Sequence, residues 1–502
     1  MKPIKQFLAF LSIVLLISCR QDDGKIEFTF LQVNDVYEIA PIQGGKYGGM
    51  ARLETIHQEL IEDNKNTFVM MAGDFLNPSL LGTIKYEGDR IRGRQMVEVM
   101  NAMDFELAAF GNHEFDLSKN DLQKRINESS FHWIGANVAL NNDGVIAPFY
   151  KEENNIKNTI SKTHTISIKD SDGTTIKIGF ISVCIPSNPR SYVSYSDMFS
   201  AAKASYESLK DSVDVVFGLT HVNIHQDKRI AEMLPNIPLI MGGHEHTNMK
   251  HQVGNTIIAK ADANAKSAYI HKITFNKETN KATVTSTLKE INAAIKSEER
   301  VGGIVEKWQK ILNTKIKEIV ANPNEVIYEA KVPLDGRDTP IRSKQTNLGE
   351  LVTEAMAFAF DNKVDGALVN GGSIRIDDEL IGEVTSTDIF RVLPFGGSVY
   401  KIEIKGFLLE EVLNFGKQAK GKGPYLQRFN INEKENNWFI NEQKLNPRKT
   451  YTLAVSDYLL KGFDIPVLTE KAKGVISVYK PTPSEVGYDI RKAVILYLKT
   501  LK

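Results

Sequence analysis

The amino-acid sequence predicts an α/β protein with two domains joined by a helix. Three observations lead to this expectation. Short apolar runs of strand length alternate with amphipathic helical patterns from Lys25 onward. One long helical pattern over residues 301–320 interrupts this alternation, which then resumes. At 502 residues the chain is also too long for one ordinary hydrophobic core.

The composition is that of an ordinary globular protein. Hydrophobic residues make up 42% of the chain and charged residues 25%, and the formal net charge is zero. We see no long basic run outside the extreme N-terminus. Nothing in the charge pattern therefore favours nucleic acid as a partner.

Residues 1–19 have the pattern of a targeting segment. Lys2 and Lys5 precede an apolar stretch over residues 7–17 that is too short to span a bilayer comfortably, and the segment ends at Cys19. This ending resembles a bacterial lipobox, in which the cysteine is lipidated and becomes the mature N-terminus. We therefore expect an extracytoplasmic protein of the bacterial envelope, lipid-anchored at Cys19 on the periplasmic or surface face of the outer membrane. The alternative is a plain secretory signal in which Cys19 is incidental.

The first domain is expected over residues 25–292. Amphipathic patterns predict helices over residues 52–62 and 94–103. Apolar runs predict strands at residues 26–33, 67–72, 107–110, 134–138, 176–183, 213–220 and 237–241. Alternating strands over residues 269–275 and 282–288 would close the edge of the domain. This order is typical of layered α/β architecture.

A linking helix is expected within residues 293–321, and a second α/β domain over residues 322–502. Val301, Val305, Trp308, Leu312 and Ile316 recur at helical spacing in the linking segment. The second domain has predicted helices at residues 348–360, 407–415 and 488–501, and predicted strands at residues 366–369, 400–404 and 451–455.

Polar side chains follow the ends of several predicted strands in the first domain. They are Asp35, Asp74, Asn112, His221, His244 and His246. We expect them to lie close together, because open α/β sheets bind ligands at the carboxyl ends of their strands. Carboxylate, amide oxygen and imidazole suit two divalent ions, or one trivalent and one divalent ion. A bridging carboxylate would hold such a pair about 3.5–4 Å apart, close enough to clamp a phosphoryl group and acidify a bound water.

The distribution of histidine supports a metal site. Four of the ten histidines fall between His221 and His246, and His244 and His246 follow paired glycines at a spacing that suits a tight loop. His225 is ambiguous, with a supporting or surface role favoured. We expect structural roles for the histidines outside the motifs, namely His57, His132, His164, His251 and His271.

The motifs together resemble the 5'-nucleotidase / UDP-sugar hydrolase family. Gly73-Asp74, Gly111-Asn112-His113-Glu114, Thr220-His221 and Gly243-His244-Glu245-His246 stand in the family's order and at similar spacing. The C-terminal half agrees through residues 346–349, 370–375 and 393–397. The resemblance implies a four-layer metallophosphoesterase sandwich of the calcineurin-like type, a linking helix and a second α/β domain that binds substrate.

The resemblance also implies roles for individual residues. Asp74 would bridge two metal ions, with Asp35 and His246 on the first ion and Asn112, His221 and His244 on the second. His113 would contact the reacting phosphoryl group or the leaving oxygen, oriented by Asp116. In the second domain, Arg342 and Arg375 would grip phosphate or carboxylate, Asn370 would hydrogen-bond the ligand and Phe395 would stack on a base. The metal ions would be zinc, manganese or iron.

Two departures from the family pattern concern metal binding and base binding. The first motif, Asp-x-His in the family, reads Asp35-Val36-Tyr37 here, so the first metal loses an imidazole. Three outcomes are open for this position. Water could complete the first metal site, Tyr37 could bind a ferric ion as a phenolate, or its side chain could turn away from the site and only pack. The glycine-rich segment before the second stacking aromatic is also missing, and Phe463 is our candidate for that aromatic.

These observations predict a dinuclear metallophosphohydrolase that releases phosphate from 5'-nucleotides by attack of metal-bound hydroxide. Alternative substrates within the same class are nucleotide sugars, cyclic nucleotides and other small phosphoesters. A sulfur-substrate hydrolase of the same superfamily remains open, although Arg342, Asn370, Arg375 and Phe395 favour a nucleotide. A different class of function is a surface lipoprotein that binds a ligand or a host protein without turnover.

Overall fold

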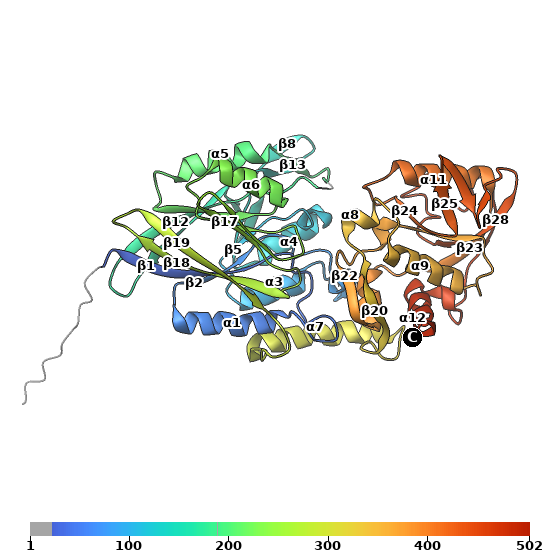
Figure 1. The fold of residues 1–502 in the computed structure, drawn as a ribbon, viewed down its shortest axis with the longest axis horizontal. Coiled ribbons are helices and arrows are strands. Elements are labelled where there is room, and N and C mark those ends of the chain that lie inside the picture. The colour runs from blue at the N-terminus through green and yellow to red at the C-terminus, as the bar shows by residue number, and fades with distance from the viewer. Residues whose placement is uncertain (1–22, 188) are drawn as a thin grey trace, which may run out of the picture.

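The structure is a computed structural model that describes residues 23–187 and 189–502. Cys19 and the expected signal peptide lie outside the described residues. Two lobes lie side by side, and helix α7 (Glu299–Lys317) runs beneath the first lobe toward the second (Figure 1). Within the described ranges, no helix combines the length and the apolar character needed to cross a membrane.

The first lobe is built on two stacked β-sheets. The strand order of the first sheet is β19-β18-β1-β2-β5-β6, and that of the second is β11-β12-β14-β15-β17-β16. Aromatic side chains fill the space between the sheets, with Phe30 lying 5.5 Å from Phe180 and 5.2 Å from Phe217 between ring centroids. The strands of the first sheet are β1 (Lys25–Val33), β2 (Thr67–Met71), β5 (Leu107–Ala109), β6 (His132–Ile134), β18 (Ser267–Asn276) and β19 (Lys281–Glu290). Those of the second are β11 (Thr163–Lys169), β12 (Thr175–Ile181), β14 (Val215–Thr220), β15 (Leu239–Gly242), β16 (Met249–Val253) and β17 (Thr256–Lys260).

Helices cover the outer faces of both sheets, which makes four layers. Helices α1 (Met50–Asp63), α3 (Arg94–Ala102) and α7 cover the first sheet, while α5 (Met198–Leu209) and α6 (Ile224–Met233) cover the second. Trp308 of α7 is fully buried, and its indole N–H donates to Glu98 of α3. This is the architecture that the resemblance implied.

Most predicted strands of the first lobe are confirmed, but residues 134–138 do not form one strand. Strand β6 ends at Ile134, and β7 (Val138–Asn142) belongs to a separate sheet of order β13-β7-β8. Asn137 is the reason for this break. Its side chain donates to the carbonyl of Cys184 and accepts from the amide of Cys184, each at 2.8 Å. This pairing turns the chain away from the first sheet.

The second lobe contains a sheet of order β24-β21-β28-β23-β29. Its strands are β21 (Gly366–Asn370), β23 (Val399–Lys405), β24 (Leu426–Phe429), β28 (Thr450–Ser456) and β29 (Val475–Tyr479). Helices α9 (Asn347–Phe358) and α11 (Gly406–Gln418) pack on this sheet, and α12 (Ile490–Thr500) packs on α9. A two-stranded ribbon, β20 (Val326–Asp335) and β22 (Glu379–Thr385), lies between this sheet and the first lobe.

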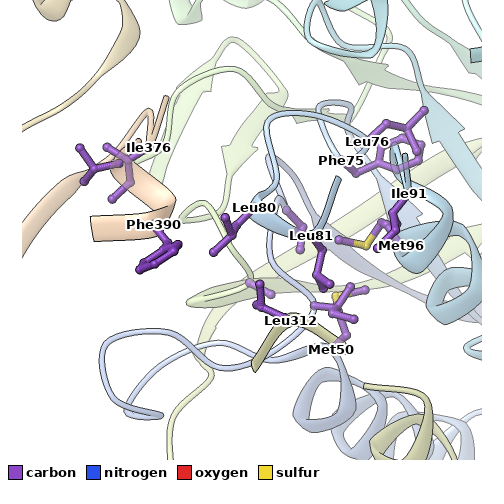
Figure 2. Packing of buried hydrophobic residues seen from close by; sticks show 14 of the residues in the cluster. Met50, Phe75, Leu76, Leu80, Leu81, Ile91, Met96, Leu312, Ile376 and Phe390 are labelled. Atoms are coloured by element: carbon purple, nitrogen blue, oxygen red, sulfur yellow. The ribbon is translucent and has the colours of Figure 1, made fainter. Parts of the chain in front are cut away.

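One hydrophobic cluster continues from the first lobe into the second. Leu80 and Leu81 of the first lobe belong to the same buried cluster as Ile376 and Phe390 of the second. Figure 2 shows Leu80 facing Phe390, with the cluster continuing toward Leu81 and Met96. Because this contact is apolar and buried, it helps to hold the two lobes together. The domain limits 25–292, 293–321 and 322–502 stay a proposal.

Candidate metal centre and substrate cleft

The predicted metal ligands meet at the carboxyl ends of the strands of both sheets. Asp35 follows β1, Asp74 follows β2, Asn112 follows β5, His221 follows β14 and His244 follows β15. His221 Nε2 lies 3.0 Å from Asp74 Oδ2. Ligand atoms of Asp74, His221 and His244 all lie within 4.8 Å of one another, which is compatible with one shared ion.

The loops that carry these ligands adopt unusual backbone conformations. The φ angles of Asp35, Asp74 and His244 are +53°, +56° and +83°, in the left-handed region that side chains other than glycine rarely adopt. Gly111 lies directly against this loop system, since a Cβ at Gly111 would fall 2.1 Å from Asp74 Oδ1. Strained backbone and close approach concentrate at functional sites.

Glu114 holds the loop that follows β2. Its buried carboxylate accepts hydrogen bonds from the backbone amides of Asp74 at 2.9 Å, Phe75 at 2.8 Å, Leu76 at 3.1 Å and Gly111 at 2.6 Å. Burial and the charge of Asp74 raise the pKa of Glu114 to about 7. Glu114 therefore fixes the position of Asp74 through the backbone of its loop.

The donor atoms fit a bound metal. Among the described residues, the buried Asn112 Oδ1 has no hydrogen-bond partner, and the buried Asp74 Oδ2 and His221 Nε2 lie 3.0 Å apart and have no other hydrogen-bond partner. Buried polar atoms are normally paired, so the donor set of these three residues fits a cation. His221 Nδ1 contacts the carbonyl of Ala72 at 2.8 Å, which turns Nε2 toward Asp74.

The centre carries a surplus of negative charge. Burial alone would lower the pKa of His221, but Asp74 and Asp35 outweigh it and raise the pKa to about 9. In the same way, Asp377 and Asp35 overcome burial and raise the pKa of His246 to about 10. His244 differs, because burial and His221 lower its pKa to about 4. The carboxylates thus create a field that attracts cations.

Tyr37 points into the centre instead of turning away. The tyrosine is 3% exposed, and its hydroxyl lies 3.1 Å from His246 Nε2 and 3.5 Å from Asp35 Oδ1. Burial and the carboxylates of Asp74 and Asp35 raise the pKa of Tyr37. These contacts favour a neutral hydroxyl at this position.

His113 and Asp116 form the expected pair beside the ligands. His113 Nδ1 lies 2.9 Å from Asp116 Oδ2, and the amide of His113 donates to Asp74 at 2.7 Å. Two arginines from opposite lobes also contact Asp116. Arg190 lies 2.7 Å from Oδ1, and Arg375 of the second lobe lies 2.8 Å from Oδ2.

A cavity of about 900 Å³ lies between the lobes and brings together the predicted substrate-binding residues of the second lobe. Arg342, Asn370, Arg375 and Phe395 line this cavity. Arg342 Nε is buried without a hydrogen-bond partner among the described residues, and Phe395 is 62% exposed. Phe463 is 71% exposed and is not among the lining residues.

Two cavity residues were not expected from the sequence. Tyr458 and Asp464 line the cavity, and Asp464 accepts from Asn370 Nδ2 at 2.7 Å and from the Tyr458 hydroxyl at 3.1 Å. Tyr458 lies two residues after the end of β28. The expectation that ligand-binding residues follow strand ends could therefore have identified it from the sequence.

A smaller cavity of about 390 Å³ connects this cleft to the metal centre. Asp74, Asn112, His113, His244 and His246 line it from the first lobe, and Arg337, Asp338 and Asp377 from the second. Ser187, Asp338 and Thr339 border both cavities. A ligand in the large cavity can therefore extend a phosphoryl group toward the metal ligands.

Two family models match the chain, one in each lobe. The model of the calcineurin-like phosphoesterases matches residues 28–248, and that of the 5'-nucleotidase C-terminal domain matches residues 326–470. The chain belongs to the 5'-nucleotidase family of metallophosphoesterases. Its membership makes it a metal-dependent hydrolase, in agreement with the donor atoms described above.

Known relatives are similar over most of this chain at low identity. The trifunctional nucleotide phosphoesterase protein YfkN of Bacillus subtilis is 25% identical over 501 residues, covering 90% of this chain. The chain spans 33% of the length of that relative. Human 5'-nucleotidase is 25% identical over 455 residues, which are 80% of this chain and 74% of the human protein. The crystal structure of the 5'-nucleotidase precursor from Thermus thermophilus has the same fold, with a TM-score of 0.67 at 21% identity over 95% of this chain and 97% of that one.

A second group of potential ligands lies away from the metal centre. Glu106, His132 and His164 offer atoms within 4.8 Å of one another, where the edge strands β6 and β11 of the two sheets meet. His164 Nε2 lies 3.2 Å from Glu106 Oε1, so a hydrogen bond beside a neighbouring imidazole accounts for this group.

Proposed function

We propose that the chain releases phosphate from 5'-nucleotides with the help of two transition-metal ions, drawn from zinc, manganese and iron. One observation carries the proposal. The buried donor atoms of Asp74, Asn112 and His221 lie beside a cleft lined with the cationic and aromatic side chains that a nucleotide requires.

The proposed metal ligands divide into two sets that share Asp74. Asp35 and His246 complete the first position, and Asn112, His221 and His244 complete the second. When bound, such ions acidify a water molecule and neutralise charge on the phosphoryl oxygens. The loop contacts of Glu114 and the contact between His221 and Ala72 keep the donor atoms in place without the substrate.

His113 is the proposed acid that assists the leaving oxygen. Burial lowers its basicity, but Asp74 and Asp116 outweigh burial and raise the pKa of His113 to about 10, which favours the protonated imidazole. Asp116 holds Nδ1, which leaves Nε2 free to donate a proton or a hydrogen bond toward the phosphoryl group.

The second lobe provides the proposed nucleotide contacts. Arg342 and Arg375 would bind phosphate oxygens through their planar guanidinium groups. Phe395 and Tyr458 would stack on the base, with Tyr458 in the place that we had expected for Phe463. Asn370 and Asp464 already share a hydrogen bond and would bind ribose hydroxyls.

Cys19 is the proposed site of a lipid anchor. The lipobox pattern at residues 16–19 supports it, and the anchor would place the enzyme outside the cytoplasm on the cell envelope. Its test is metabolic labelling with a fatty-acid analogue, in which the wild-type protein becomes labelled and the C19A variant does not.

The decisive experiment measures phosphate release from 5'-AMP by residues 20–502 supplied with manganese or zinc, beside the H113A variant. We expect release that falls by roughly 10²–10⁴-fold in H113A. UDP-glucose, a cyclic nucleotide and a thiosulfate ester in parallel reactions separate the alternative substrates. Equal background rates for wild type and H113A with every metal would overturn the proposal and favour a binding protein.

A further inference from the structure

Asp377 of the second lobe reaches the metal centre of the first lobe. It lies between Gly371–Ser373, a short 3-10 helix, and β22, on the side of the second lobe that faces the cleft. Asp377 Oδ2 lies 3.5 Å from His246 Nε2 and 3.7 Å from His113 Nε2. No motif of the family resemblance covers this residue, and the proposed function leaves it without a role.

The backbone of Asp377 also determines the orientation of a ligand. His246 Nδ1 contacts the carbonyl oxygen of Asp377, so a proton on Nδ1 donates across the lobe boundary. In the neutral ring with its proton on Nδ1, His246 Nε2 faces the centre as the atom that can bind a metal. Asp377 has a φ angle of +44°, and such strain is kept where a position is functionally required.

The donor atoms around His246 Nε2 are spaced like neighbouring ligands of one metal ion. Asp35 Oδ1 lies 3.4 Å from this nitrogen, and Asp377 Oδ2 lies 3.5 Å from it. Zinc bonds to nitrogen and oxygen are about 2.0–2.2 Å long, so neighbouring ligand atoms around one ion lie roughly 3–3.6 Å apart. Each carboxylate is therefore close enough to this nitrogen to share an ion with it.

The charges at this place also favour a cation. Asp35 is fully buried and the side chain of Asp377 is 14% exposed, and both carboxylates face the same imidazole nitrogen. Two buried carboxylates are costly unless positive charge lies between them. Tyr37, which stands where the family has a metal-binding imidazole, offers this place a hydroxyl that lies 3.1 Å from His246 Nε2 and 3.5 Å from Asp35 Oδ1.

We propose that Asp377 is a ligand to the metal ion at the first position, supplied by the second domain in place of the imidazole that Tyr37 lacks. The inference rests on the proposed function for the existence of that ion. It follows that binding of the first metal couples to closure of the two lobes, because one ion then contacts side chains of both.

The test measures manganese binding to demetallated protein, residues 20–502, by calorimetry and by electron paramagnetic resonance. Wild type should bind one ion at each position and give the spectrum of a spin-coupled pair. In D377A we expect the manganese affinity of the first position to fall at least tenfold, while the second position keeps its affinity. The spin-coupled signal should then be absent when one manganese ion per site has been added. Because only a close pair gives this spectrum, an ion at Glu106, His132 and His164 would not imitate it.

The matched control is D378A, which removes the neighbouring carboxylate. Asp378 pairs with Lys266 at 3.2 Å across the same lobe boundary, so D378A reports the cost of a lost interface ion pair. D377N, which keeps the size of the side chain, serves if D377A does not fold. Equal manganese affinity and equal spectra in wild type, D377N and D378A would overturn the inference. Metal binding is measured without substrate, so absence of phosphate release from 5'-AMP would refute the proposed function and leave this test intact.

Discussion

The guanidinium group of Arg375 lies 2.8 Å from Asp116 Oδ2, and Asp116 in turn holds His113 Nδ1 at 2.9 Å. An arginine of the second lobe thus contacts the carboxylate that orients the proposed acid of the first. The same arginine lines the substrate cavity. Binding of substrate and positioning of His113 are therefore connected through one side chain.

This relationship predicts an unequal effect of two arginine substitutions. R375K should lower kcat/KM for 5'-AMP by roughly 10–100-fold, because lysine cannot form both contacts of the planar guanidinium group. R190K is the control, since Arg190 contacts the same carboxylate at 2.7 Å but its side chain is 45% exposed. Steady-state kinetics of both variants checks the prediction, and equal losses would contradict the role of Arg375.

The second stacking aromatic can be identified by a pair of substitutions. Y458A should raise KM for 5'-AMP by a factor equivalent to about 1–3 kcal/mol, because base stacking on an aromatic ring contributes that much. F463A should leave KM nearly unchanged, since Phe463 is exposed and lies outside the cavity lining. A larger effect in F463A than in Y458A would restore the expectation drawn from the sequence.

Glu114 should contribute more to stability than its position beside the catalytic motif suggests. E114Q keeps the shape of the side chain, but its amide group would face backbone N–H groups that need an acceptor. We expect a loss of roughly 2–3 kcal/mol in the free energy of unfolding, measured by urea denaturation in the presence of chelator. E59Q, on the exposed face of α1, should stay within about 0.5 kcal/mol of wild type. A small loss for E114Q would show that the loop after β2 is held by other contacts.

His271 should make the stability of the first lobe sensitive to acid. Burial and the charge of Lys250 lower the pKa of His271 to about 3, and its ring contacts Ser286 at 2.7 Å and Gln32 at 2.8 Å. In the unfolded chain the pKa is about 6.5. Above pH 6.5, His271 is neutral in both the folded and the unfolded state, and its full contribution to stability is present. As the pH falls toward 3 the unfolded state alone binds the proton, so the stabilisation is lost.

The lowered pKa of His271 predicts how stability changes with pH. The difference in the free energy of unfolding between wild type and H271L should shrink by roughly 2 kcal/mol from pH 7 to pH 5. Urea denaturation at both pH values measures the difference, and H251L on the edge strand β16 is the control histidine variant. An advantage that stays constant between the two pH values would mean that His271 titrates normally in the folded protein.

Several features could be predicted from the sequence because they depend on local periodicity. The strands at residues 25–33 and 67–71 and the helix Glu299–Lys317 each show their pattern within one segment, and the polar residues after strand ends identify the cluster of donors. The strand expected over residues 134–138 failed for a non-local reason, since Asn137 pairs with Cys184, which lies 47 residues away in the sequence.

The sequence by itself determined the two-domain α/β architecture, the family and the residue types gathered at the metal centre. Only the tertiary structure decided that Tyr458 and not Phe463 lines the cleft, that Glu114 supports the loop of Asp74, and that Asp377 of the second lobe faces His246 of the first. The first two facts depend on contacts between distant segments within one lobe, and the third depends on how the two lobes dock. Docking is set by buried surface and charge across the boundary between the lobes. No periodic pattern along the chain predicts which residues meet at that boundary.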